Sequence, residues 1–322
     1  MHMSAPYIPC LDLGSYVNGS EEDRKKFSDE LGRAFNDSGF VTITNHGLSQ
    51  ELIDQLYENI QAVFALPMEI KQKYEKPELA GQRGYTSPGK ETAKGAKTPD
   101  LKEFWQIGQE VTDGDPVKSE YPDNEVLEEL PDFNKVTRAV YTKLEENGIE
   151  LLRAIATYLG LPINYFDAHV HNGNSILRGI HYFPIEDPDS LPADAVRAGA
   201  HEDINLITLL IGASADGLEV LTMGNEWLPI KAHHTDIVVN VGDMVQRLTN
   251  NKLKSTTHRV VNPPRELMKT SRFSVPFFLH PKSNMDLTSL ESCIDGLHPK
   301  LYEDMTAGQY LDERLREIGL KK

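Results

Sequence analysis

A series of short strand-like runs in the second half of the chain limits the possible folds more than any other feature. The runs cover residues 175–183, 204–211, 217–222, 236–241, 255–261 and 271–279, and glycine, proline and asparagine separate them. Many short strands at this spacing are typical of a β-sandwich or a barrel. The sequence therefore predicts a mainly β core in this half of the molecule.

The first half alternates helical and strand signals. Residues 21–37 predict an amphipathic helix, because Phe27, Leu31 and Phe35 recur every four positions. Further elements are expected along the chain: a strand over 38–47, a helix over 49–75 with a break at Pro67, a mobile polar loop over 77–100, and a helix over 131–160.

No obvious linker separates the two halves, so we expect a single domain over residues 1–322. A mostly helical part, 1–170, is expected to pack on a β core over 171–280. Residues 281–322 are expected to form a helical extension at the C-terminal end.

Composition narrows the class of protein. The chain has 322 residues and a formal net charge of −16, and so acidic a surface repels phosphate backbones, which makes nucleic acid an unexpected partner. Cys10 and Cys293 are too few for a disulfide framework or a zinc–cysteine site. With no secretory signal and no apolar run of 18 residues, we expect a cytoplasmic protein without a membrane partner. The oligomeric state is left open, with a monomer favoured.

The segment AHEDINLITLL (200–210) places His201 and Asp203 two positions apart at the head of an apolar run. Residues two apart in a strand point to the same face, so both side chains can reach one point while Glu202 points away. An imidazole and a carboxylate together suit a divalent transition metal. The pair therefore predicts part of a metal site.

A third ligand is expected at His258. This residue lies in KSTTHRVV, where the β-branched neighbours indicate a strand and an apolar residue would pack better. The alternative is a histidine satisfied within the core. His233 and His234 are adjacent, so they face opposite ways in a strand, and their polar surroundings indicate an exposed loop. The other histidines considered, His46, His280 and His298, are expected at a turn, at a strand end and in a loop.

A second unusual pair lies in the strand-like run SRFSVPFFL, where Arg272 and Ser274 share one face. An inward-facing arginine is costly unless an anion pairs with it. A guanidinium beside a hydroxyl is well suited to a bound carboxylate. We therefore expect a carboxylate-bearing ligand at this position.

Taken together, these residues resemble the iron(II)- and 2-oxoglutarate-dependent oxygenases of the isopenicillin N synthase-like family. The order and spacing of His201, Asp203, His258, Arg272 and Ser274 match that family. The run NVGDMVQRLTNNKLKSTTHRVV (240–261) is similar to the family's approach to its distal histidine, and GFVTITNHG (39–47) is similar to the segment that opens its fold. The resemblance extends over about residues 7–280.

The resemblance implies a double-stranded β-helix, or jelly roll, with helices packed outside it. It implies iron(II) held by His201, Asp203 and His258, and 2-oxoglutarate held through its distal carboxylate by Arg272 and Ser274. With dioxygen, such an enzyme oxidises an unactivated C–H bond of a small molecule by hydroxylation, desaturation or cyclisation, and releases succinate and carbon dioxide.

One position departs from the family pattern. Many relatives carry a tyrosine just before the proline of the strand that precedes the first histidine ligand, and here that position is Phe183. Alternation places His181 on the same face as Phe183. We expect both residues to line the substrate pocket, although His181 bonded to nearby backbone is an equal alternative.

Further substrate contacts are expected from two regions. The resemblance implies a partly apolar pocket face formed by Leu210, Val260 and Phe278. The positively charged segment 81–97, which contains Arg83 and Tyr85, is expected either to recruit an anionic substrate or to be an ordinary solvated loop.

Two other functions remain open at the level of sequence. The first is an oxidase of the same fold that uses dioxygen without 2-oxoglutarate, as isopenicillin N synthase does. Because that enzyme has a similar arginine–serine pair for its substrate, Arg272 and Ser274 cannot distinguish the two, and Phe183 slightly favours the oxidase. The second is a jelly roll that binds a metal or ligand without catalysis.

Overall fold

The computed structural model describes residues 8–79, 81–91, 98–192, 195–212, 216–231 and 233–317. Within these ranges a large sheet of eight strands has the order β1-β2-β10-β7-β12-β5-β4-β3. Its strands are β1 (Cys10–Asp12), β2 (Phe40–Thr44), β3 (Gly84–Thr86), β4 (Lys102–Gly108), β5 (Ile176–Tyr182), β7 (Ile207–Ile211), β10 (Ile237–Val241) and β12 (Arg272–Leu279).

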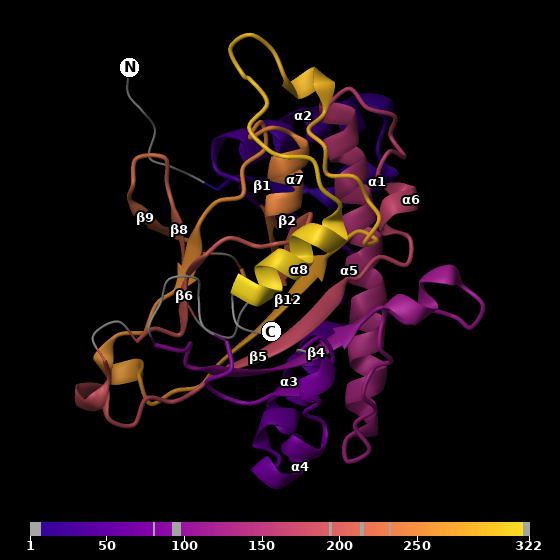
Figure 1. Cartoon of the computed structure of the whole chain (residues 1–322). Coiled ribbons are helices and arrows are strands. Elements are labelled where there is room, and N and C mark those ends of the chain that lie inside the picture. Colours follow the sequence, from indigo (N-terminus) through magenta and orange to yellow (C-terminus); the bar gives the residue numbers. More distant parts are fainter. Residues whose placement is uncertain are drawn as a thin grey trace.

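A smaller sheet packs against one face of the large sheet (Figure 1). In the described part of the chain it has four strands in the order β6-β11-β8-β9, all antiparallel. Apolar side chains from both sheets form two small clusters, one around Ile180 and Val260 and the other around Val220 and Val238. The strands are β6 (Ala198–His201), β8 (Leu218–Leu221), β9 (Trp227–Pro229) and β11 (His258–Val260).

Helices cover the opposite face of the large sheet. The long helix α5 packs against α2 and α3 and contacts β7 and β12 (Figure 1). The main apolar core lies between this helical layer and the sheet. The α-helices are α1 (Leu13–Asn18), α2 (Glu21–Asp37), α3 (Gln50–Ala65), α4 (Met68–Lys73), α5 (Pro131–Tyr158), α6 (Asp167–Val170), α7 (Asp243–Leu248) and α8 (Ala307–Glu317). Short 3-10 helices cover Pro77–Leu79, Pro116–Glu120, Pro188–Ser190, Arg265–Leu267 and Glu291–Cys293.

The predicted fold class, a jelly roll with flanking helices, is confirmed. Helix α2 has the bounds expected from its apolar spacing, and Ser20 and Asp23 form a reciprocal capping box at its start. The expected break at Pro67 separates α3 from α4, because proline cannot donate the hydrogen bond that would continue the helix.

The prediction of a loop over 77–100 is wrong in part. Residues Gly84–Thr86 form β3, which pairs with β4 at the edge of the large sheet. Strand β3 was missed because this segment reads as polar and glycine-rich, and β4, which follows the segment, was not recognised in the sequence either. The sheet therefore contains four strands from the part of the chain, 1–170, that was expected to be mostly helical.

None of the helices in the described ranges combines the length and the apolar character needed to cross a bilayer.

Candidate active site

A cavity of about 410 Å³ lies between the two sheets. Strands β4, β5, β7, β10 and β12 of the large sheet supply one wall, and β6, β8 and β11 of the small sheet supply the other. Helix α8 contributes Leu311, Arg314 and Leu315 to the lining. The C-terminal helical segment therefore forms part of the cavity rather than a separate appendage.

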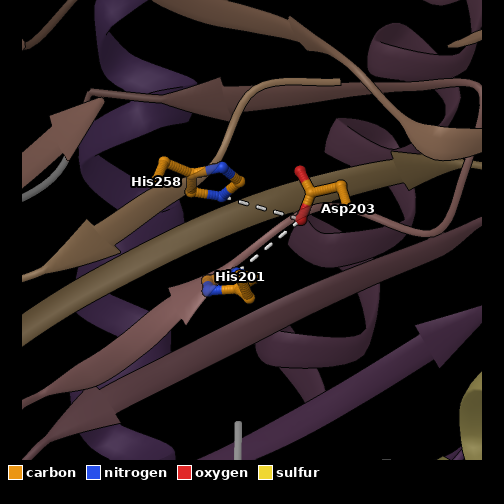
Figure 2. Close-up of side chains that lie close together, drawn as sticks. All are labelled: His201, Asp203 and His258. Atoms are coloured by element: carbon orange, nitrogen blue, oxygen red, sulfur yellow. Dashed lines mark ion pairs between the residues drawn. The ribbon is translucent and has the colours of Figure 1, made fainter. Parts of the chain in front are cut away.

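His201, Asp203 and His258 converge on one point in this cavity (Figure 2). Asp203 Oδ1 lies 3.8 Å from His201 Nε2 and 3.7 Å from His258 Nε2. The three ligand atoms all lie within 4.8 Å of one another. At the roughly 2.1 Å bond length of imidazole and carboxylate ligands, two atoms on one ion lie at most about 4.2 Å apart. Small side-chain adjustments therefore suffice for all three to share one ion.

Backbone contacts prepare both imidazoles for a metal. His201 Nδ1 lies 2.7 Å from the carbonyl oxygen of Gly199, and His258 Nδ1 lies 3.1 Å from that of Thr256. Because a carbonyl only accepts, each Nδ1 must carry the hydrogen, which leaves the Nε2 lone pair facing Asp203. Burial, followed by the neighbouring His258, lowers the pKa of His201, so its ring is neutral as a metal ligand must be.

The carboxylate of Asp203 is oriented by two donors. Its Oδ2 accepts hydrogen bonds from Thr208 Oγ1 at 2.5 Å and from Asn240 Nδ2 at 2.7 Å. Asn205 Nδ2 donates to Thr208 Oγ1 at 2.8 Å and fixes that hydroxyl in turn. Burial opposes ionisation of Asp203, but the two imidazoles and these donors lower its pKa. One oxygen is thus saturated by the protein, and Oδ1 remains directed at the imidazoles.

Arg272 and Ser274 lie on the cavity wall, as their shared strand face predicted. They stand opposite Tyr182 and Ile180, their partners on the neighbouring strand β5. The Arg272 guanidinium is almost fully buried and lies 5.0 Å from the centre of the Tyr182 ring, and its Nε donates to the carbonyl oxygen of Asp216. A buried cation beside a hydroxyl and a phenol fits a carboxylate.

Comparison with known proteins identifies this arrangement. Residues 8–129 match the family model described as non-haem dioxygenase in morphine synthesis N-terminal, and residues 164–281 match that of the 2OG-Fe(II) oxygenase superfamily. The chain is 34% identical over 96% of its length to "Proline hydroxylase buaE" of Petromyces alliaceus, and covers 98% of that protein. The chain belongs to the 2-oxoglutarate- and iron(II)-dependent oxygenases.

Other relatives of this oxygenase support the same family assignment. It is 31% identical over 96% of both chains to "2-oxoglutarate-dependent dioxygenase frbA" of Dothideomycetidae sp.. A crystal structure of a 2OG-Fe(II) oxygenase family protein from Caulobacter crescentus has a TM-score of 0.87 and 42% identity, covering 98% of this chain and all of that one. A full-length Neurospora crassa protein in complex with alpha-KG and thymine has a TM-score of 0.85 and 27% identity, covering 98% of both chains. The enzyme class and its cofactors, iron(II), 2-oxoglutarate and dioxygen, follow from this membership.

The structure corrects the prediction that His181 and Phe183 line the pocket. The His181 ring stacks on Phe273 on the helix-facing side of the sheet, 4.8 Å between centroids, and lies 5.5 Å from the ring of Phe64 in α3. The strand therefore has the opposite register, and the residue that faces the cavity is Tyr182. A shift of one position exchanges the two faces of a strand. Tyr182 therefore provides a phenol on the cavity face, although Phe183 occupies the position where many relatives have tyrosine.

Arg83 and Tyr85 are also turned away from the cavity, which corrects their expected role as substrate contacts. Arg83 is fully buried beside Gly108 and donates to the carbonyl oxygen of Gln82. Tyr85 donates to Glu103 Oε2 at 2.5 Å on the helix-facing side. Both residues serve packing. Residues 92–97 of the expected charged segment lie outside the described residues.

The remaining predicted contacts, Leu210, Val260 and Phe278, do line the cavity. Sequence reasoning missed several polar residues there, including Glu91, Lys102, Gln106, Arg178 and His280. Arg178 carried the same signal as Arg272, a charge within an apolar strand. Lys102 and Gln106 were missed because β4 itself was not recognised.

Glu103 organises a structural network on the outer face of the sheet. Its carboxylate accepts from Lys71 Nζ at 2.8 Å and Tyr85 Oη at 2.5 Å, and pairs with His181 Nδ1 at 2.8 Å. We expect Tyr85→Phe to lower the free energy of unfolding by about 1.5–3 kcal/mol, because a hydrogen bond to a buried charge is lost. The affinity for 2-oxoglutarate should stay unchanged. Denaturant titration and a binding titration check the two parts, and a weaker 2-oxoglutarate affinity would contradict the structural role.

Asn240 provides a test of the orientation of Asp203. In Asn240→Ala, Oδ2 keeps only the Thr208 hydroxyl and the carboxylate can rotate, so we expect metal affinity to fall about 10–100-fold. Anaerobic titration with Co²⁺, followed by its visible absorption, measures the loss. Asn59→Ala, the matched control, removes a partly exposed asparagine on α3 whose Nδ2 donates to the carbonyl oxygen of Gln55. Equal affinity in the two variants would show that Thr208 suffices.

Proposed function

We propose that His201, Asp203 and His258 hold the iron and that Arg272 and Ser274 hold the distal carboxylate of 2-oxoglutarate, while a small molecule occupies the rest of the cavity. The assignment of the iron ligands rests on the convergence of two Nε2 atoms and one carboxylate oxygen. When bound, iron with 2-oxoglutarate and dioxygen supplies the oxidation of an unactivated C–H bond, with release of succinate and carbon dioxide.

The side chains of this protein orient the reactants. The Arg272 guanidinium presents a planar set of N–H donors, which matches a carboxylate better than the point charge of a lysine does. Ser274 lies two residues further along the same strand face, where its hydroxyl can donate to the same anion. The buried setting strengthens these contacts because little water competes for them.

The other cavity walls support a small-molecule substrate. Leu210, Val260 and Ile180 provide apolar surface near the metal ligands, and such surface limits the water around the reacting carbon. A cavity of about 410 Å³ is in the range of small-molecule sites. The printed names of relatives, a proline hydroxylase and a protein in complex with thymine, support small cyclic substrates. The free thiols of Cys10 and Cys293 support a reducing compartment such as the cytoplasm, and we propose a monomer that acts on neither nucleic acid nor membrane.

The two alternatives are less well supported. An oxidase that works without 2-oxoglutarate was favoured by Phe183, but Tyr182 now provides a phenol beside Arg272. A jelly roll without catalysis gives no reason for two imidazoles that face an oriented carboxylate next to a buried arginine. The relatives named as 2-oxoglutarate-dependent favour the oxygenase.

Removal of a metal ligand tests the iron site. We expect His201→Ala, Asp203→Ala and His258→Ala each to abolish stoichiometric iron binding, because a three-ligand site has no ligand to spare. His233→Ala and His234→Ala are the matched controls, since both side chains are exposed in the loop before β10. Iron analysis after anaerobic loading decides the question. If iron binding survives in His258→Ala and falls in His234→Ala, the assignment is wrong.

Arg272→Ala tests the co-substrate site. Loss of one partner of a buried charge pair costs about 2–5 kcal/mol, so we expect the concentration of 2-oxoglutarate needed for half-saturation to rise roughly 30-fold or more. Arg272→Lys should restore part of the affinity, and Ser274→Ala should cost about 1 kcal/mol. The measurement is the charge-transfer absorption of the anaerobic iron(II) complex during titration. Absence of this band in the unmodified protein would replace the proposal by the oxidase without 2-oxoglutarate.

A further inference from the structure

A second guanidinium faces the cavity, at Arg178 on β5. It lies over the Phe104 ring at 4.2 Å and near the Phe278 ring at 5.2 Å. Its Nε donates to Gln106 Oε1 at 2.9 Å, and Gln106 is itself held by the carbonyl oxygen of Gly81. The orientation of the Arg178 guanidinium is therefore fixed before any ligand binds.

Arg178 already has a counter-ion inside the cavity. Its Nη1 donates to Glu91 Oε2 at 3.1 Å, and Glu91 Oε1 also accepts from Lys102 Nζ at 2.6 Å. Lys102 in turn donates to Asp100 Oδ2 at 2.8 Å, while Asp100 Oδ1 accepts from the backbone N–H of Gly199. Two acids and two bases thus form a closed network whose net charge is zero.

The pKa values of Glu91 and Lys102 keep these two side chains charged at neutral pH. Burial opposes ionisation of Glu91, but Lys102 and Arg178 lower its pKa to about 2. Burial also opposes protonation of Lys102, yet Glu91 and Asp100 raise its pKa. His280, which lines the same region, is neutral because burial lowers its pKa to about 4. Arg314 of α8 also lines the cavity, and it has its own counter-ion because it pairs with Glu317 at 2.5 Å.

One edge of Arg178 remains available to a ligand. No group of the described chain accepts a hydrogen bond from its Nη2, while Nε and Nη1 are engaged. Arg178 stands two positions from Ile180 on the cavity face of β5, and the apolar side chains of Ile176 and Phe278 lie in the same wall. The site thus offers a fixed N–H donor above an apolar surface, with no net charge.

Resting on the proposed function, we propose that the substrate is an uncharged molecule that presents a hydrogen-bond acceptor, such as an amide or lactam carbonyl, to Arg178. Glu91 acts as a charge filter. A carboxylate on Nη2 would lie beside the carboxylate of Glu91, and two like charges at such a distance in a buried site repel strongly. A neutral carbonyl accepts the same hydrogen bond without this repulsion. Glu91 is therefore a specificity-determining residue.

A pair of probes of equal shape tests the filter. We would titrate 4-fluorobenzamide and 4-fluorobenzoate into the protein loaded with Zn²⁺ and saturating 2-oxoglutarate, which cannot turn over, and follow binding by fluorine NMR. The amide should bind at least about 10-fold more tightly than the carboxylate, since repulsion between like charges in a buried site readily exceeds the 1.4 kcal/mol that this ratio requires. In Glu91→Gln, where Lys102 keeps Asp100, the carboxylate should gain roughly 10-fold or more in affinity while the amide changes less than about threefold.

The control is Glu146→Gln, which removes one charge from an exposed position on α5 and should leave the ratio of the two affinities unchanged. A preference of the unmodified protein for the carboxylate, an unchanged ratio in Glu91→Gln, or failure of both probes to bind would each overturn the inference. The comparison in the unmodified protein holds even if Glu91→Gln does not fold. Binding of 2-oxoglutarate, measured in the same samples, distinguishes failure of the proposed function from failure of this inference. If 2-oxoglutarate does not bind, the proposed function is wrong. If it binds but the protein shows no preference between the amide and the carboxylate, only the role of Glu91 is wrong.

Discussion

The site depends on how one carboxylate is held where the chain crosses between the two sheets. His201 ends β6 of the small sheet, β7 of the large sheet begins at Ile207, and Asp203 lies in the connection between them. Thr208 and Asn240, both on the large sheet, hold its Oδ2. Asp203 thereby joins a proposed ligand set whose two histidines belong to the small sheet. A metal ion held by all three residues would connect the two sheets.

Charge balance is the second constraint, because an unpaired charge between two sheets is costly. The protein satisfies Arg178 with Glu91 and satisfies Lys102 with Asp100 and Glu91. Beside Arg272 on the cavity wall stand the hydroxyl groups of Ser274 and Tyr182. The carboxylate of Glu91 thus disfavours an anionic ligand at Arg178, whereas the hydroxyls beside Arg272 can donate to one. Two arginines on the cavity face of the same sheet can in this way select ligands of different charge.

The sequence predicted much of this arrangement but not always for the correct reason. His201 and Asp203 converge as expected, yet they do not alternate along one strand, since the strand ends at His201. Helix α2 follows from the spacing of its apolar residues, and the break between α3 and α4 follows from Pro67 itself. Both signals are local, so a short stretch of sequence suffices to predict them. Strands β3 and β4 could not be predicted, because their stability comes from pairing, β3 with β4 and β4 with β5, rather than from their own composition. The register of β5 was misread by one position because His181 is a plausible residue for either face.

The two faces of β4 and β5 explain why that misreading was hard to avoid. On the outer face Glu103 pairs with His181, and on the inner face Lys102 stands opposite Tyr182, so charged and polar residues occupy both faces of the same strands. Alternation alone cannot then identify the functional face. The two faces differ in whether the hydrogen-bonding groups of the side chains are all satisfied within the protein. The carboxylate of Glu103 is satisfied by three side chains of the protein itself, which is the pattern of a structural network. On the inner face Nε and Nη1 of Arg178 are engaged and no group of the described chain accepts a hydrogen bond from Nη2, so this donor on the cavity wall is available to a ligand.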